Sequence, residues 1–83
     1  MSVKKGTDLT LTVVGDIVDI IPMIITPTND MDLVFKGNTY HLKRGPHTYD
    51  DVVITEGRND FVFRYNGDNS YSTVSLKMTG GKF

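Results

Sequence analysis

The feature that most constrains the fold of this chain lies in its last third. Residues 52–54 form a short apolar run, Val-Val-Ile, and a polar corner, Glu-Gly-Arg-Asn-Asp, follows at residues 56–60. Residues 60–65 then alternate strictly, with Phe61 and Phe63 directed to one face. A strand, a tight corner and a second alternating strand in close succession predict a small all-β domain. The stretch contains no pattern typical of catalysis.

The composition also favours strands joined by tight turns. The sequence contains no alanine, no glutamine and a single glutamate, Glu56, so the best helix formers are nearly absent. Thr, Val and Ile together supply 25 of the 83 residues, and these residue types favour strands. There is no cysteine, which excludes a disulfide scaffold and a thiolate metal site. The fold must therefore be held by packing or by a partner.

Apolar and alternating runs recur along the chain at intervals of about ten residues, which predicts an antiparallel sandwich or barrel. Pro22 interrupts the second run, so we expect that strand to lie at a sheet edge or to break there. Lys36-Gly37-Asn38 predicts a hairpin turn centred on Gly-Asn, since both residues tolerate positive φ. We predict a single antiparallel β-sandwich of seven to eight short strands, immunoglobulin-like or galectin-like, over residues 1–83. The runs are residues 9–14, 17–25, 31–35, 39–42, 49–54, 60–65 and 71–78.

Several polar clusters contain residue types that can carry chemistry, and each is explained better by a solvated surface. His41, His47, Asp50 and Asp51 do not have the spacing of common zinc sites. Residues 66–69, Asn-Gly-Asp-Asn, lack the alternating acidic ligands of a calcium loop, so a plain hairpin turn is expected. The paired carboxylates, Asp30 with Asp32 and Asp50 with Asp51, and the serines at 70, 72 and 75 show no catalytic context. We therefore expect no enzyme activity, no metal and no cofactor.

The charge and hydropathy of the chain restrict its partners. The net charge is −1, so there is no basic excess to hold a phosphate backbone, and we expect no nucleic-acid partner. No apolar run approaches the roughly 20 residues that a membrane helix needs, so no membrane association is expected. Residues 1–6 and 80–83 are expected to be flexible arms. Lys4, Lys5, Lys82 and Phe83 in these arms are the candidate partner-binding residues.

Tyrosines on the predicted strands provide an alternative kind of site. Tyr40, Tyr49 and Tyr71 would stack on sugar rings if they were exposed together, although strand aromatics are more often core residues. A carbohydrate-binding module is therefore one functional hypothesis. It predicts that alanine substitutions at these three positions abolish binding without unfolding the domain.

Four motifs follow one another along the chain: Leu-Thr-Leu-Thr-Val-Val-Gly-Asp at residues 9–16, a Pro-centred apolar strand at 21–26, a hairpin at 31–42 and Glu-Gly-Arg-Asn-Asp-Phe-Val-Phe at 56–63. Their order resembles that of the C-terminal galectin-like β-sandwich of siphophage distal tail proteins. The resemblance covers residues 9–78, but the segment 43–51 is shorter than in that family and the N-terminal belt domain is absent. The family is structural and has no catalytic residues to transfer.

The resemblance implies a small phage virion protein, made in the host cytoplasm and incorporated into the particle as a tail or capsid module. Its partners would be other virion proteins or further copies of itself, and no small-molecule ligand is expected. An immunoglobulin-like piece of a larger adhesin would also satisfy the fold class alone, because fold does not assign function.

Overall fold

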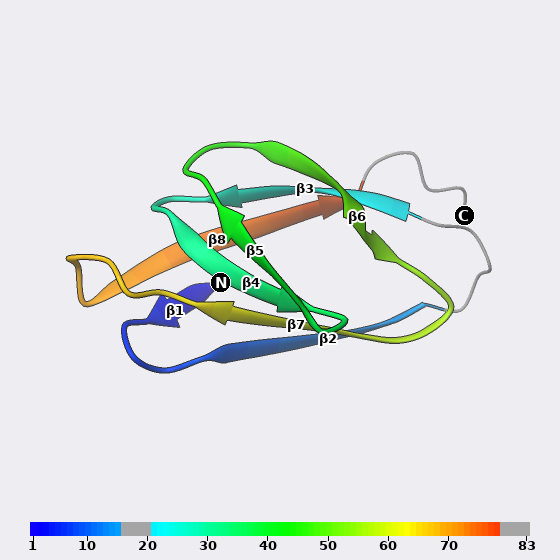
Figure 1. Ribbon diagram of the computed structural model, residues 1–83, viewed down its shortest axis with the longest axis horizontal. Helices are drawn as coiled ribbons and strands as arrows, with labels where there is room; N and C mark the ends of the chain where they lie inside the picture. Colours follow the sequence, from blue (N-terminus) through cyan, green and yellow to red (C-terminus); the bar gives the residue numbers. More distant parts are fainter. Residues whose placement is uncertain (16–20, 79–83) are drawn as a thin grey trace.

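The described part of the chain, residues 1–15 and 21–78 of a computed structural model, consists of β-strands joined by short connections (Figure 1). Most strands coincide with the alternating or apolar runs of the sequence, because one face of each is buried. The strands are β1 (Ser2–Lys4), β2 (Leu9–Gly15), β3 (Ile21–Pro27), β4 (Met31–Phe35), β5 (Asn38–Leu42), β6 (His47–Ile54), β7 (Gly57–Arg64) and β8 (Tyr71–Met78).

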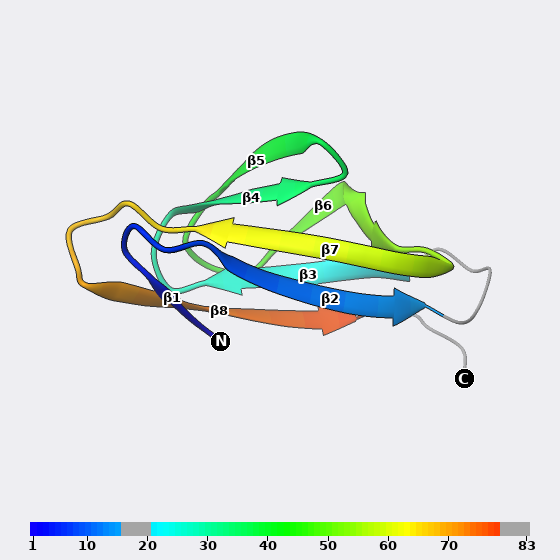
Figure 2. The ribbon, with the colours of Figure 1, turned by 90° about the horizontal axis from the view of Figure 1, so that it is seen from below.

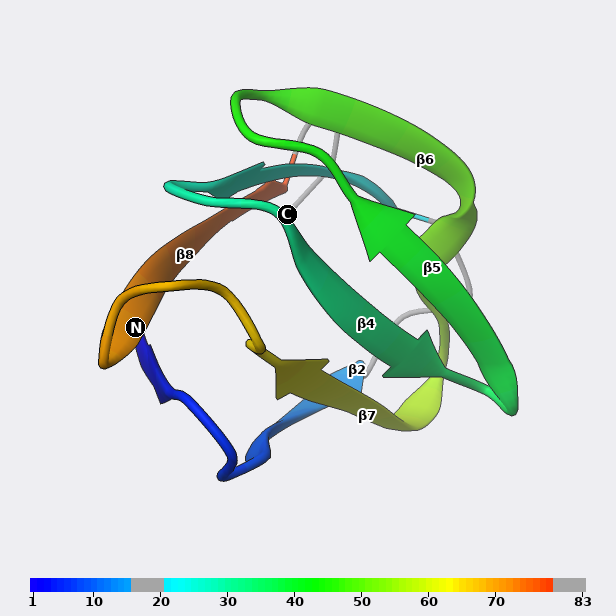
Figure 3. The same cartoon turned by 60° about the vertical axis from the view of Figure 1, so that its left-hand side comes forward.

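The strands form two four-stranded sheets that pack face to face, as the view in Figure 3 shows. One sheet has the order β1-β8-β3-β6 and the other the order β2-β7-β4-β5. The nested antiparallel pairs β1–β8, β2–β7, β3–β6 and β4–β5 are those of a long hairpin rolled up into a jelly roll. The predicted all-β sandwich is confirmed. Its immunoglobulin-like form is not, because that fold keeps its first two strands adjacent in one sheet.

The core lies between the sheets and is built by the alternation of their strands. Leu33, Phe61 and Phe63 are fully buried, and the rings of Phe35 and Phe61 stack with centroids 4.7 Å apart. Burying such a side chain contributes about 1.5–3 kcal/mol, and the aromatic pair adds a further increment of about 1 kcal/mol. The predicted facing of Phe61 and Phe63 is therefore confirmed.

The expectation of a flexible arm at residues 1–6 is wrong. Ser2–Lys4 forms β1 and pairs with Thr73–Tyr71 at the start of β8. Val3 is fully buried, and this single apolar side chain between two polar ones anchors the segment to the core. Three residues are too few for a recognisable period, which is why the sequence pattern missed this strand. The other predicted arm, residues 80–83, lies outside the described residues.

Of the two alternatives expected for the Pro22 strand, the edge position is wrong, because β3 is flanked by β8 and β6. The expected break at Pro22 corresponds to an irregularity in the pairing of β3. Pro22 lies opposite Val53 of β6, and the register of β3 against β6 shifts between Pro22 and Ile24. Strand starts and irregularities are the positions where a sheet accepts proline.

The β4–β5 hairpin is confirmed, but its turn lies one residue earlier than predicted. Lys36 and Gly37 have φ values of 50° and 79°, while Asn38 already pairs with Phe35 as the first residue of β5. Two consecutive residues with positive φ match the twist of a two-residue hairpin, and glycine supplies the second without strain. Lys36 accepts a conformation that asparagine adopts more readily.

The β6–β7 corner is held by one buried side chain, Asn59, which is 1 % exposed. Its Oδ1 accepts hydrogen bonds from the backbone N and hydroxyl of Thr55 at 3.1 and 3.2 Å. Its Nδ2 lies 2.8–3.1 Å from the carbonyl oxygens of Val13, Thr55 and Gly57. The amide thus joins the corner to β2. β7 begins at Gly57, which pairs with Gly15 of β2, earlier than the alternation beginning at residue 60 indicated.

Four connections lie together at one end of the sandwich, named here the loop end: those of β1–β2, β3–β4, β5–β6 and β7–β8 (left in Figures 1 and 2). This grouping follows from the jelly roll, in which successive strands cross between the two sheets. Loops carried on a rigid sandwich are the usual location of binding residues. The loop end is therefore where a site is expected.

Candidate ligand-binding site at the loop end

Two hollows adjoin Tyr71 at the loop end. The first, the hydroxyl groove, has a volume of about 450 Å³ and is lined by Thr28, Asn29, Asn69, Ser70, Tyr71, Ser72 and Thr73. The second, the lysine hollow, has a volume of about 360 Å³ and is lined by Ser2, Lys4, Lys5, Ser70 and Tyr71. Both volumes fall within the range of small-ligand sites. Tyr71 and Ser70 belong to both hollows, so we treat them as one site, the Tyr71 site.

The pairing of β1 with β8 positions the charged and aromatic residues of this site. Lys4 lies directly opposite Tyr71, and directly opposite side chains project from the same face of a sheet. Val3 and Ser72 are buried and point inward, so Lys4 and Tyr71 point outward. Tyr71 is 56 % exposed. The sequence-predicted docking residue Lys4 and the sequence-predicted stacking residue Tyr71 thus meet in one site.

Hydrogen bonds between the β3–β4 connection and β8 hold the groove in shape. The buried Ser72 hydroxyl donates to Asn29 Oδ1 at 2.9 Å. The backbone N of Thr28 donates to the carbonyl of Thr73 at 2.8 Å, and their hydroxyls also contact each other. These contacts hold residues 28–29 against residues 72–73, the two segments that line the groove. The lining is therefore in place without a ligand. Such preorganisation lowers the entropic cost of binding.

The backbone also fixes the lysine hollow. Lys5 N donates to the carbonyl of Ser70 at 3.0 Å, and Asn69 N donates to the hydroxyl of the buried Tyr65 at 3.2 Å. The connection between β7 and β8 is therefore held from both sides. The predicted hairpin turn at residues 66–69 is wrong, because β7 and β8 lie in different sheets and the segment crosses from one sheet to the other.

The lining chemistry suits a neutral or anionic polar ligand. The hydroxyl groove is lined only by hydroxyl and amide side chains, which both donate and accept hydrogen bonds. The only charged residues among those lining the two hollows are Lys4 and Lys5. The site combines one exposed aromatic ring, a set of hydroxyls and amides, and two cations.

The other two predicted stacking residues, Tyr40 and Tyr49, do not belong to this site. They lie on β5 and β6 with ring centroids 6.3 Å apart and an interplanar angle of 65°. Both are half-buried and pack against the core, and the Tyr49 hydroxyl accepts a hydrogen bond from Lys43 N at 3.3 Å. The two rings contact each other between β5 and β6, which are edge strands of the two sheets. The structure therefore does not bring Tyr40, Tyr49 and Tyr71 together on one exposed surface.

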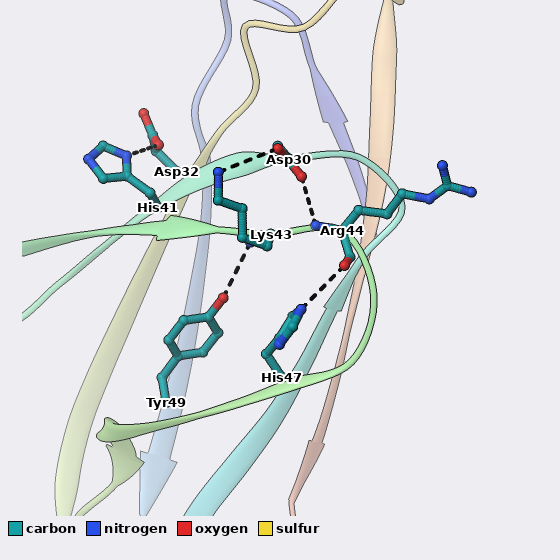
Figure 4. Close-up of polar contacts among 7 residues, drawn as sticks. All are labelled: Asp30, Asp32, His41, Lys43, Arg44, His47 and Tyr49. Atoms are coloured by element: carbon teal, nitrogen blue, oxygen red, sulfur yellow. Dashed lines mark hydrogen bonds and ion pairs between the residues drawn. The ribbon is translucent and has the colours of Figure 1, made fainter.

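Figure 4 shows that the two histidines are not brought together as metal ligands. His41 Nδ1 lies 2.8 Å from Asp32 Oδ1, whereas His47 Nε2 is 3.3 Å from the carbonyl oxygen of Arg44. Within residues 1–15 and 21–78, no three His, Cys, Asp or Glu side chains are placed to hold a metal ion. The side chains of Asp50 and Asp51 lie outside the described part of the structure.

The Asp30–Asp32 carboxylates are engaged in contacts with their neighbours. Asp30 Oδ1 accepts from Arg44 N at 2.8 Å, and its Oδ2 is 3.8 Å from Lys43 Nζ (Figure 4). These groups border a third hollow of about 370 Å³, lined by Asp30, Met31, Asp32, His41, Leu42, Lys43, Arg64, Asn66 and Gly67. Because several of its polar side chains already contact one another, it offers fewer free groups to a ligand than the Tyr71 site.

Exposed ion pairs lie on the outer side of the β2–β7 pair. Arg64 donates two hydrogen bonds of 2.9 Å to Asp8, and these bonds hold the pKa of Asp8 below its ordinary value. Hydrogen bonds also lower the pKa of Asp60: the bond from the Thr12 hydroxyl has the largest effect and the bond from Arg58 the next largest. The groups are exposed, so these pairs add little to stability.

Sequence reasoning missed most of the hydroxyl groove. Its residues come from two segments, 28–29 and 69–73, that join only in the folded chain. The one available signal was the run Asn-Ser-Tyr-Ser-Thr at residues 69–73, an aromatic residue among hydroxyls. Lys5 lies in the site as well, whereas Lys82 and Phe83 lie outside the described residues.

Comparisons of the chain with protein-family models, with curated proteins and with solved structures found no match. Among the described residues there is also no helix of the length and hydropathy needed to cross a membrane.

Proposed function

We propose that this chain is a non-enzymatic structural or accessory module of a phage particle, docked on a tail or capsid assembly. The observation that carries the proposal is the strand order of a jelly roll, an architecture used by viral capsid domains and by lectin domains. The resemblance of residues 9–78 to a phage tail sandwich supports the same assignment.

In this role the protein is made in the host cytoplasm and reaches the virion by binding other virion proteins or further copies of itself. Val14, at the end of the edge strand β2, is 72 % exposed, and an apolar side chain at a sheet edge favours such association. Assembly adds stability to a small domain, because a partner that binds only the folded state shifts the folding equilibrium.

The experiment is gold labelling of purified particles with an antibody against this chain, followed by electron microscopy. Labelled capsids would identify a decoration protein, and labelled tails or tips would identify a tail module. Particles without any label would refute the proposal.

The second candidate function is a carbohydrate-binding module, and the Tyr71 site specifically favours it. An exposed aromatic ring beside a groove of hydroxyls and amides provides a stacking surface and hydrogen-bonding partners for sugars. Binding of an isolated glycan by the purified domain, lost in Tyr71→Ala, is the test. The hypothesis drawn from the sequence used Tyr40, Tyr49 and Tyr71 as stacking residues, whereas this candidate uses Tyr71 alone.

A further inference from the structure

The Tyr71 site has features that define the charge of its ligand as well as its class. Tyr71 is one of three large hydrophobic residues, with Met1 and Val14, that remain exposed in the described part of the chain. It alone among them borders both hollows. A flat apolar ring with a polar tip at such a junction suits a ligand that is itself part apolar and part hydroxylated.

The hydroxyl groove supplies the directional contacts. Asn29 presents its amide oxygen to Ser72, and in the described structure no contact occupies its two N–H donors. The hydroxyls of Thr28 and Thr73 contact each other, and each retains further lone pairs. A row of fixed donors and acceptors matches adjacent hydroxyls on a sugar ring better than it matches an apolar ligand.

The lysine hollow supplies positive charge on the other side of the ring. Lys4 stands opposite Tyr71, and Lys5 lines the same hollow. No carboxylate lines either hollow, although the whole chain carries a net charge of −1. The two ammonium groups are therefore free to pair with an anion that is bound beside the aromatic ring.

From this arrangement we infer that the Tyr71 site binds an acidic oligosaccharide. Tyr71 stacks on one sugar ring, the hydroxyl groove binds the hydroxyls of that ring or its neighbour, and Lys4 and Lys5 pair with carboxylate or phosphate substituents. The inference rests on the second candidate function and specifies its ligand. It is independent of whether the protein is part of a particle.

The experiment is titration of ¹⁵N-labelled protein with defined glycans, followed by amide chemical shifts. The acidic probes are oligogalacturonate, oligomannuronate and short poly(glycerol phosphate). The neutral probe is methyl-esterified oligogalacturonate, which keeps the sugar and masks the charge. We expect at least one acidic probe to shift amides at residues 2–5, 28–29 and 69–73, and the methyl ester to bind at least fivefold more weakly than its acid.

Three variants test the residues. Tyr71→Ala should weaken binding at least tenfold, and the double variant Lys4→Gln/Lys5→Gln at least fivefold, with a smaller salt dependence. Lys36→Gln/Lys43→Gln removes the same charge from exposed positions outside both hollows and should leave binding unchanged. The amide spectrum of each variant reports whether it is folded.

Each contrary result has a distinct meaning. Equal binding of the acid and its methyl ester would overturn the acidic ligand but leave carbohydrate binding intact. Shifts confined to other residues would overturn the placement of the site. No response to any glycan would overturn both the inference and the carbohydrate-binding function. Tighter binding of a twelve-residue oligothymidylate at the same amides would assign the site to single-stranded nucleic acid instead.

Discussion

Replacement of Asn59 by alanine should cause one of the largest losses of stability available from a polar side chain in this domain. Asn59 is 1 % exposed, and its amide contacts the backbone on both sides of the β6–β7 corner and on β2. Removing it leaves the N–H of Thr55 and the carbonyls of Val13 and Gly57 without this partner. Buried polar groups that lose a partner are costly, because water does not replace the bond.

The magnitude follows from the number of bonds. The carbonyl oxygen accepts two hydrogen bonds, and the amide nitrogen has two hydrogens to share among three carbonyls. Four bonds at about 1 kcal/mol each give a loss of roughly 4 kcal/mol. A domain of this length has a stability of roughly 4–12 kcal/mol, so the substitution removes a third of it or more.

Urea unfolding monitored by circular dichroism measures this effect, with Asn38→Ala as the matched control. Asn38 is exposed, and its substitution should change stability by less than about 0.5 kcal/mol. Asn59→Asp keeps the size and the acceptor but turns a carboxylate oxygen toward the three carbonyls. The loss of stability in Asn59→Asp should become smaller as the pH falls and the carboxyl becomes protonated. Equal urea midpoints for Asn59→Ala and Asn38→Ala would refute the role of the network.

Three further substitutions test other parts of the fold. Gly67→Ala should cost about 1–3 kcal/mol in urea unfolding, because its Cβ would collide with the buried ring of Tyr65; an unchanged midpoint would contradict this packing. Lys36→Asn should raise stability by up to about 1 kcal/mol, because asparagine tolerates the positive φ of the turn; a lower thermal midpoint would oppose it. The bonds from Arg64 lower the pKa of Asp8 in the folded state, so their stabilisation is present above the ordinary pKa and is lost as the pH falls through the lowered one. Asp8→Asn should therefore flatten the fall of the urea midpoint below about pH 4, and an unaltered pH profile would argue against it.

The elements that could be predicted are those whose signal is local. The alternation of Phe61 with Phe63 and of Val74 with Leu76 identifies the buried faces of β7 and β8, and these positions are buried or half-buried. The two runs around Gly37 identify a hairpin because its strands are adjacent in the sequence. In each case a period of two residues and a turn signal are sufficient.

The rest depends on contacts between distant residues. The pairing of β1 with β8 joins the two ends of the domain, and a three-residue strand around Val3 has no period by which it could be detected. Asn59 looked like an ordinary corner residue, because only the folded chain places Val13 beside its amide. The Tyr71 site escaped for the same reason, since Asn29 and Ser72 are joined by a hydrogen bond across 43 positions.

The most direct test of the proposed function is sedimentation of phage particles through a density gradient, followed by quantitative immunoblotting for this chain. The particles come from a lysate of the cells in which the chain is produced. A virion module should sediment with the major capsid or tail protein at a fixed ratio across the particle peak, and should stay there after a high-salt wash. Recovery of all of the chain in the soluble fractions at the top of the gradient would contradict the proposal.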